Sequence, residues 1–308
     1  MTDSDSTATD TEEGASATDH PADTAGGERP AGDAGTGNGD AVTGERDTGG
    51  TGDSEGAGYT GGAASGPVVV DSVRRSFGDL TVLSDVSFSA PAGTVNCFVG
   101  PNGSGKTTLL RIVAGLLAPT GGRVDVAGAS GRSVGYLPQS PSFRPQFTLR
   151  ETLGFYEELA GVEIDPDAVL ARVGLEDVAD RRVGELSGGM TRLFGIAQAT
   201  VGEPPVLVLD EPSSGLDPTM TEHVGTVIRE LADDGHTVVL ATHDLETVDR
   251  VADTVLVLDD GVVQVADSPE TLRRETDSET LTHAVAQYLV GEVGGLTVRT
   301  GSRGDDDE

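Results

Sequence analysis

Short apolar runs separated by helix-like stretches dominate most of the chain. The runs at 134–137, 205–210 and 237–242 are rich in β-branched residues and do not alternate with polar ones. Continuous apolar runs of this kind are typical of parallel strands that are buried on both faces. The run 94–99 leads into a glycine-rich loop, and the apolar residues over 109–118 then recur with helical spacing. The pattern predicts an α/β domain built on a largely parallel sheet.

Turn and capping signals mark further elements. Glu151 follows Thr148 by three residues, which is the form of a capping box and predicts an amphipathic helix that begins there. Helical signals dominate 148–200. An Asp-Gly pair at 260–261 lies between two apolar runs and predicts a β-hairpin. A Ser-Pro pair at 268–269 predicts the cap and first residue of another helix.

The two ends of the chain differ in composition from its middle. Residues 1–65 are almost all Asp, Glu, Gly, Thr, Ala and Ser, with no Leu, Ile or Phe. Such a segment cannot bury enough apolar surface to offset the entropy lost on ordering, so we predict a disordered acidic tail. An α/β domain is predicted over 66–275, with a helical subdomain at about 141–200. Residues 276–308 are predicted to form a short helix and an acidic tail.

The chain is strongly acidic, with 52 acidic and 20 basic residues among 308 and a formal net charge of -32. A polyanion repels nucleic acid and anionic membrane surfaces, so nucleic acid is not expected as a partner. Of the basic residues, only Lys106 is a lysine. We interpret this bias as adaptation to a high-salt, haloarchaeal cytoplasm, where charges are screened within about 3 Å. An acidic protein from a low-salt organism is the alternative.

The single cysteine and the absence of targeting signals bear on the compartment. Cys97 lies in an apolar run, can form no internal disulfide and fits a reducing compartment. It is predicted to be a core residue. The first residues lack the basic and apolar segments of a signal peptide, and nowhere do 18 apolar residues run together. We therefore expect that the chain alone neither spans nor crosses a membrane.

The glycine-rich loop carries a phosphate-binding motif. Residues 100–107, GPNGSGKT, match the pattern G-x-x-x-x-G-K-[ST] completely, between a predicted strand and a predicted helix. Backbone amides of such a loop close around phosphates, and the helix N-terminus adds positive partial charge. Lys106 is predicted to reach the β- and γ-phosphates, and Thr107 to offer its hydroxyl to Mg²⁺. The predicted ATP-binding residues of the loop are Gly100, Pro101, Asn102, Gly103, Ser104, Gly105, Lys106, Thr107 and Thr108.

An acidic pair ends a later apolar run. Asp210 closes the run 205–210, where its carboxylate can hold Mg²⁺ directly or through water. Glu211 follows at once. Because the chain turns at a strand's end, Glu211 can address an attacking water while Asp210 faces the metal. Taken alone, such a pair could also be a solvated strand end.

A Leu-Ser-Gly-Gly sequence at 186–189 begins 24 residues before Asp210. With the phosphate loop and the acidic pair, it makes the chain resemble the ATP-binding-cassette (ABC) ATPases over about 67–275. The resemblance implies a P-loop NTPase core with a RecA-like mixed sheet flanked by helices, an antiparallel β subdomain and an inserted α-helical subdomain. It also implies ATP hydrolysis with Mg²⁺ as the metal.

The resemblance assigns roles to single residues. Phe77 matches the aromatic residue that stacks on adenine, and Asp217 matches the loop that couples two sites across a dimer. Gln139 matches the glutamine that contacts Mg²⁺ and the attacking water, and His243 matches the histidine that contacts the γ-phosphate. Four residues are expected to contact ATP held by the opposite subunit, so hydrolysis implies a homodimer or a pair of ATPase subunits. These four are Ser187, Gly188, Gly189 and Asp217.

The predicted chemistry is in-line transfer of the γ-phosphoryl group to water. Glu211 is the predicted general base, and His243 and Gln139 are expected to orient it and the water. Lys106, Mg²⁺ and the opposite Ser187 are expected to stabilise the γ-phosphate. The residues predicted to hold Mg²⁺ are Thr107, Gln139 and Asp210.

The chain departs from the family pattern just after the signature sequence. Met190 stands where glutamine is commoner, and Arg192 and Leu193 stand where Gln-Arg is frequent. Neither change removes a group on the phosphates. These departures leave the subfamily and the substrate undetermined, but they do not affect the prediction of ATP hydrolysis.

ABC ATPases usually couple closure of their dimer to a membrane permease. The resemblance therefore implies an integral-membrane permease on a separate chain, with this protein cytoplasmic and peripheral on the inner face of the cell membrane. The segment 147–162, the sequence SGGM and the short tail resemble exporter-type or nitrous-oxide-reductase-maturation ATPases more than sugar importers. A hydrophobic surface near Gln139 is expected to receive the permease. Its candidate residues, which could equally be ordinary core, are Phe143, Phe147, Phe155 and Tyr156.

A soluble ABC ATPase of the iron-sulfur cluster assembly type is the alternative. Members that act on DNA need a long coiled-coil insertion, which is absent between Gln139 and Ser187. Members that act on ribosomes usually carry two cassettes, and this chain has one phosphate loop.

Overall fold

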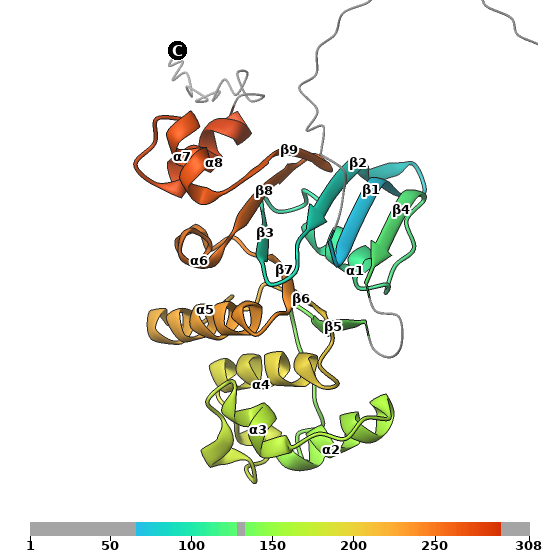
Figure 1. The fold of residues 1–308 in the computed structure, drawn as a ribbon, viewed down its shortest axis with the longest axis vertical. Helices are drawn as coiled ribbons and strands as arrows, with labels where there is room; N and C mark the ends of the chain where they lie inside the picture. Colours follow the sequence, from blue (N-terminus) through green and yellow to red (C-terminus); the bar gives the residue numbers. More distant parts are fainter. Residues whose placement is uncertain (1–65, 128–132, 291–308) are drawn as a thin grey trace, which may run out of the picture. The chain divides into compact units, whose positions relative to one another are not determined.

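A computed structural model describes residues 66–127 and 133–290 of the chain. They are organised around a six-stranded sheet with the order β5-β6-β7-β3-β8-β9 (Figure 1). Neighbouring strands are parallel except at one edge, where β9 pairs antiparallel with β8. The predicted tail 1–65 and the acidic end lie outside the described residues. The strands of this sheet are β3 (Val95–Val99), β5 (Val134–Leu137), β6 (Val206–Asp210), β7 (Thr237–Ala241), β8 (Thr254–Asp259) and β9 (Val262–Asp267).

A second, antiparallel sheet has the order β2-β1-β4. Helix α1 (Lys106–Val113) shares one hydrophobic core with this sheet and with one face of the central sheet. Leu109 of the helix, Phe88 of β2 and Phe98 of β3 belong to this core, and the two aromatic rings meet edge to face with centroids 4.9 Å apart. The strands of the second sheet are β1 (Val68–Phe77), β2 (Leu80–Ala90) and β4 (Gly121–Val126).

Successive residues of the central strands face two different cores. In β3, Val95, Cys97 and Val99 belong to one core, whereas Phe98 belongs to the other. All four side chains are buried. Burial on both faces explains why these strands appear in the sequence as continuous apolar runs. The prediction that Cys97 is a core residue is confirmed.

Helices between β5 and β6 form the inserted helical part of the chain. They are α2 (Leu149–Ala160), α3 (Pro166–Ala171), two short 3₁₀ helices η1 (Glu176–Val178) and η2 (Val183–Glu185), and α4 (Gly188–Thr200). The predicted capping box is confirmed at the start of α2. Thr148 Oγ1 accepts the N–H of Glu151 at 3.1 Å, and Glu151 Oε2 accepts the N–H of Thr148 at 2.9 Å.

The remaining helices follow the later strands. They are α5 (Pro218–Asp233), α6 (Leu245–Val251), α7 (Pro269–Glu275) and α8 (Leu281–Val290). The predicted hairpin joins β8 to β9, and Ser268 caps α7 as predicted. Helix α1 is shorter than its apolar pattern predicts, because the chain turns at Gly115, which has a φ of 70°. Within the described ranges, no helix combines the length and the hydropathy needed to cross a bilayer.

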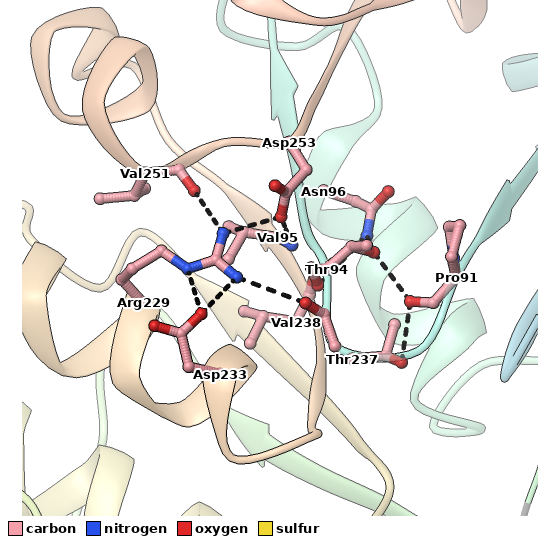
Figure 2. Close-up of polar contacts among 11 residues, drawn as sticks. Pro91, Thr94, Val95, Asn96, Arg229, Asp233, Thr237, Val238, Val251 and Asp253 are labelled. Carbon is pink, nitrogen blue, oxygen red and sulfur yellow. Dashed lines mark hydrogen bonds and ion pairs between the residues drawn. The ribbon is translucent and has the colours of Figure 1, made fainter.

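An arginine of α5 contacts the residues at the start of the central strands (Figure 2). The phosphate loop follows Val99, at the other end of β3. Arg229 Nη1 lies 2.8 Å from Oδ2 of Asp253, and its guanidinium also pairs with Asp233 one turn along α5. The same Asp253 oxygen accepts the N–H of Val95 at 2.8 Å. Arg229 Nη2 donates to the carbonyl oxygen of Gly93 at 3.3 Å. The guanidinium thereby ties a helix to the strand that leads into the phosphate loop.

Candidate active site

The phosphate loop connects β3 to α1 and depends on glycine at two close approaches. Gly100 and Gly105 have φ angles of 150° and 105°, in the region that favours glycine. A methyl group on Gly100 would lie 2.0 Å from the carbonyl oxygen of Leu258, and one on Gly105 would lie 2.7 Å from Cδ2 of Leu83. The loop can therefore pack against β8 and β2 only because these residues lack side chains.

Lys106 is the first residue of α1, and its side chain folds back over the loop. Nζ donates to the carbonyl oxygens of Gly100 at 2.8 Å and Pro101 at 2.9 Å. Burial lowers the pKa of Lys106, while the nearby carboxylates of Glu211 and Asp210 oppose this effect. The ammonium is thus held at the mouth of the loop beside two carboxylates.

Thr107 and Asp210 bring two hard oxygen ligands together. Thr107 Oγ1 donates to Asp210 Oδ1 at 3.2 Å, and the other Asp210 oxygen is buried without a hydrogen-bond partner among the described residues. Burial raises the pKa of Asp210, and the hydrogen bond from Thr107 opposes this effect. Hydroxyl and carboxylate oxygens suit Mg²⁺, which keeps several waters and takes one or two protein ligands beside phosphate. The donor set and the unpartnered oxygen therefore fit the predicted metal.

Glu211 leaves the sheet through a left-handed turn. Its φ is 53°, and its N–H donates to the carbonyl oxygen of Ala241 at 2.8 Å. Its carboxylate Oε2 lies 2.8 Å from Nδ1 of His243, which comes two residues after β7. The Glu211 side chain is 11% exposed and the His243 side chain 66% exposed. The Glu211 carboxylate therefore contacts His243, whereas that of the adjacent Asp210 contacts Thr107.

A cavity of about 310 Å³ lies over the phosphate loop. Gln139 reaches it from the segment after β5, so β5, β6 and β7 each deliver predicted site residues at their carboxyl ends. Val82 of β2 also lines the cavity, and no motif in the sequence pointed to this residue. The lining residues are Val82, Asn102, Gly103, Gly105, Lys106, Thr107, Thr108, Gln139 and Glu211.

Phe77, at the end of β1, is not among these lining residues. Its ring is exposed, and the guanidinium of Arg75 stacks over it at 4.3 Å from the centroid. β2, which pairs with β1, carries the lining residue Val82. Stacking of Phe77 on adenine stays a prediction.

The signature residues also lie outside the cavity lining and at helix starts. Ser187 caps α4 by accepting the N–H of Met190 at 3.2 Å, and Asp217 caps α5 by accepting the N–H of Met220 at 3.1 Å. Both capping residues are exposed. Their side chains are therefore available to another molecule rather than turned into the cavity of their own chain.

Two arginines beside the carboxylates had no role in the sequence motifs. Arg111 of α1 lowers the pKa of Asp210 through its charge, against the larger effect of burial. Arg192 of α4 interacts electrostatically with Asp210 and Glu211, although burial lowers its own pKa. The only sequence signal for Arg192 was that it departs from the family pattern just after the signature sequence. The carboxylates thus share their site with three cations, Lys106 included.

Comparisons with known proteins agree with this arrangement. The family model described as ABC transporter matches residues 83–214. Nod factor export ATP-binding protein I of Rhizobium sp. (strain N33) is 36% identical over 217 residues, which cover 66% of this chain and 71% of the relative. The uncharacterized ABC transporter ATP-binding protein YxlF of Bacillus subtilis (strain 168) is 35% identical over 231 residues, which cover 72% of this chain and 78% of the relative.

Solved structures give the same result. The structure of an ATP-binding subunit of an ABC transporter matches with a TM-score of 0.64 and 25% identity, covering 72% of this chain and 99% of that one. The ADP conformation of MJ1267, an ATP-binding cassette of an ABC transporter, matches with a TM-score of 0.63 and 25% identity, covering 73% and 98%. The predicted fold class, a mixed α/β sheet with an antiparallel β subdomain, is confirmed. The chain therefore belongs to the ATP-binding proteins of ABC transporters and is an ABC-type ATPase.

Proposed function

We propose that the chain hydrolyses Mg²⁺-ATP with Glu211 as the general base. The observation that carries this proposal is the 2.8 Å contact between Glu211 Oε2 and His243 Nδ1 beside the phosphate loop. A carboxylate held in one orientation can accept a proton from water as the water attacks the γ-phosphorus. In this proposal Gln139, which lines the same cavity, orients that water.

The charges around the cavity support phosphate binding. The Lys106 ammonium sits at the loop mouth, and in the proposal it turns from the carbonyl oxygens of Gly100 and Pro101 to the phosphates. Thr107 and Asp210 would hold Mg²⁺, with Gln139 as a further ligand. The metal, when bound, supplies positive charge that offsets the charge of the phosphate oxygens.

The active form in this proposal contains two ATPase subunits, either identical or paired with a related chain. Ser187 and Asp217 are exposed and lie outside the lining of their own cavity. A second subunit would place its Ser187, with the signature glycines behind it, against the γ-phosphate. Each ATP is then bound between the phosphate loop of one subunit and the signature helix of the other.

The partner that we propose is an integral-membrane permease on a separate chain. An aromatic pocket of about 270 Å³ lies at the entry to α2, and we propose that a permease segment docks there. Arg144 lies over the ring of Phe147 at 5.4 Å and over that of Phe155 at 5.3 Å, and Phe155 is 43% exposed. Phe143 is different, because it is partly buried and its ring packs at a tilt of 58° against that of the core residue Phe194, with centroids 4.8 Å apart. The pocket residues are Ser142, Phe143, Arg144, Phe147, Thr152, Phe155 and Tyr156.

The direction that we propose is export. The relatives named as export ATP-binding proteins, at 35–36% identity, support this direction rather than the iron-sulfur assembly alternative or the nitrous-oxide-reductase-maturation type. Attachment through the permease would place the protein on the cytoplasmic face of the cell membrane.

Co-purification from membranes tests the partner. We expect a hydrophobic, multi-span protein to elute with the tagged chain, and Phe155→Asp to release it while ATP hydrolysis by the free chain persists. Exposed Leu116, which lies outside the aromatic pocket, gives the matched control Leu116→Asp, and this variant should keep the partner. Elution with a scaffold complex free of membrane protein would contradict the transport proposal and favour the assembly alternative.

A further inference from the structure

Helices α4 and α5 begin in the same way. Each has a capping residue whose side chain accepts the N–H of the third helical residue, and in both helices that third residue is a methionine. Apart from Met1, Met190 and Met220 are the only methionines in the chain. Both are half-buried, whereas the capping residues Ser187 and Asp217 are exposed.

The side chain of Met220 lies directly against the signature glycine Gly189. A methyl group on Gly189 would lie 2.7 Å from Cγ, 3.1 Å from Cε and 3.2 Å from Sδ of Met220. Side-chain carbons do not approach within about 3 Å of one another, because atoms in contact are packed near 3.5–4.0 Å. The neighbouring Gly188 differs, since a methyl group there would have open space within 4 Å as far as the described residues show.

Backbone conformation gives no reason for glycine at position 189. Gly189 lies inside α4 and is not among the described residues with positive φ. Alanine has the higher helix propensity at such a position. Close packing on Met220 is therefore a physical reason for glycine there that comes from within the same chain.

We propose that Met220 is a positioning residue that sets the spacing between the two capped helix starts. Its side chain packs on Gly189, while its backbone N–H is held by the Asp217 carboxylate at 3.1 Å. A shift of either helix start is therefore passed to the other through one residue. The unbranched thioether is flexible enough to keep contact through small shifts of the two helix starts. This inference rests on the proposed pairing of subunits, in which Ser187 and Asp217 face the partner's nucleotide.

Methyl NMR tests the contact without nucleotide or partner. The full chain labelled with ¹³C-methyl methionine gives signals from three residues, which Met190→Leu and Met220→Leu assign. We expect Gly189→Ala to move the Met220 signal strongly and Gly188→Ala to leave it in place. A Met220 signal that Gly189→Ala does not move would overturn the proposal, whether or not the subunits pair.

A rescue experiment tests the positioning role. In a Glu211→Gln background, which retains ATP, we expect Gly189→Ala to raise the ATP concentration for half-maximal subunit association by about tenfold or more. Adding Met220→Ala removes the Cγ, Sδ and Cε atoms that the new methyl group meets, so association should return most of the way. Met220→Ala alone should weaken association. Met220→Leu, which keeps a side chain of similar size, should associate like the parent Glu211→Gln chain.

Gly188→Ala provides the matched control. Position 188 does not contact Met220, so any loss of subunit association in Gly188→Ala has another cause, and Met220→Ala should not rescue it. Equal failure of Gly189→Ala with and without Met220→Ala, or equal rescue at both glycines, would contradict the positioning role. If the parent Glu211→Gln chain fails to associate with ATP, the proposed pairing is wrong, and the positioning role falls with it.

Discussion

Nδ1 of His243 lies 2.8 Å from Oε2 of Glu211, although the two residues are 32 positions apart in the sequence. Their strands, β6 and β7, are parallel neighbours in a register that places Asp210 opposite Ala241. The residues just after each strand therefore emerge at the same edge of the sheet. A protonated Nδ1 can donate to the carboxylate and hold it in one orientation.

Replacing His243 should slow the chemical step more than it weakens ATP binding. Without the imidazole, the Glu211 carboxylate loses its side-chain partner, and we expect kcat for His243→Ala to fall by about 100-fold with little change in KM. Phosphate release measured over a range of ATP concentrations gives both kcat and KM. His283, exposed on α8, gives the control His283→Ala, which should hydrolyse ATP at the wild-type rate. Equal loss in both variants would mean that the His243 effect is not local.

Lys106→Arg should abolish most hydrolysis although it keeps the charge. Nζ lies 2.8 and 2.9 Å from two carbonyl oxygens in a buried position, and a planar, forked guanidinium does not reproduce the geometry of a compact ammonium. We expect turnover to fall by about 100-fold, the scale seen when one donor to a transition-state oxyanion is removed. The exposed Arg123→Lys is the matched control. Undiminished turnover by Lys106→Arg would contradict the assigned role.

Arg229→Met should destabilise the fold rather than affect the chemistry directly. The substitution leaves Asp253 without its guanidinium partner while that carboxylate still accepts the N–H of Val95 (Figure 2). We expect a loss of about 1–3 kcal/mol in the free energy of unfolding. Arg123→Met, which breaks ion pairs with Asp71 and Asp125 that are more than half exposed, should cost less than about 1 kcal/mol. Denaturant unfolding of both variants measures the difference. An equal loss of unfolding free energy in the two variants would contradict a stabilising role for the contacts of Arg229.

The single thiol offers a test of the salt prediction. Burial raises the pKa of Cys97, and the charge of Asp253 adds to this, so the folded protein presents a protonated, unreactive thiol at pH 8. In molar KCl we expect no reaction with a thiol reagent. At low ionic strength a net charge of -32 is no longer screened, the protein should unfold, and one thiol per chain should react. A protected thiol and a full circular dichroism signal at low salt would show that the halophile prediction is wrong.

Local features of the fold were readable from the sequence because each depends on neighbouring residues. The capping box at Thr148 and the Asp-Gly turn at 260–261 need only a few adjacent positions. Strand order cannot be predicted in this way, because β3 lies between β7 and β8, which come more than 130 residues later in the sequence. Order and register follow from packing across the whole sheet.

The candidate site likewise contains residues that local motifs predict and residues that only tertiary packing brings in. The motifs predicted Lys106, Asp210 and Glu211, since each follows a recognisable strand or loop. Gln139 and His243 came from the resemblance to ABC ATPases. Val82 and Met220 carry no motif. Val82 lines the cavity because β2 packs against the phosphate loop at Gly105, and Met220 meets Gly189 through the packing of two helix starts. No local sequence pattern records either contact.

Glu211→Gln tests the central claim most directly. The substitution preserves the size of the side chain and removes the base, so phosphate release should fall by about 10²- to 10⁴-fold. With ATP and Mg²⁺ present in molar KCl, light scattering should then report twice the mass of the single chain, with one ATP bound per chain. Wild-type turnover by Glu211→Gln would contradict the account.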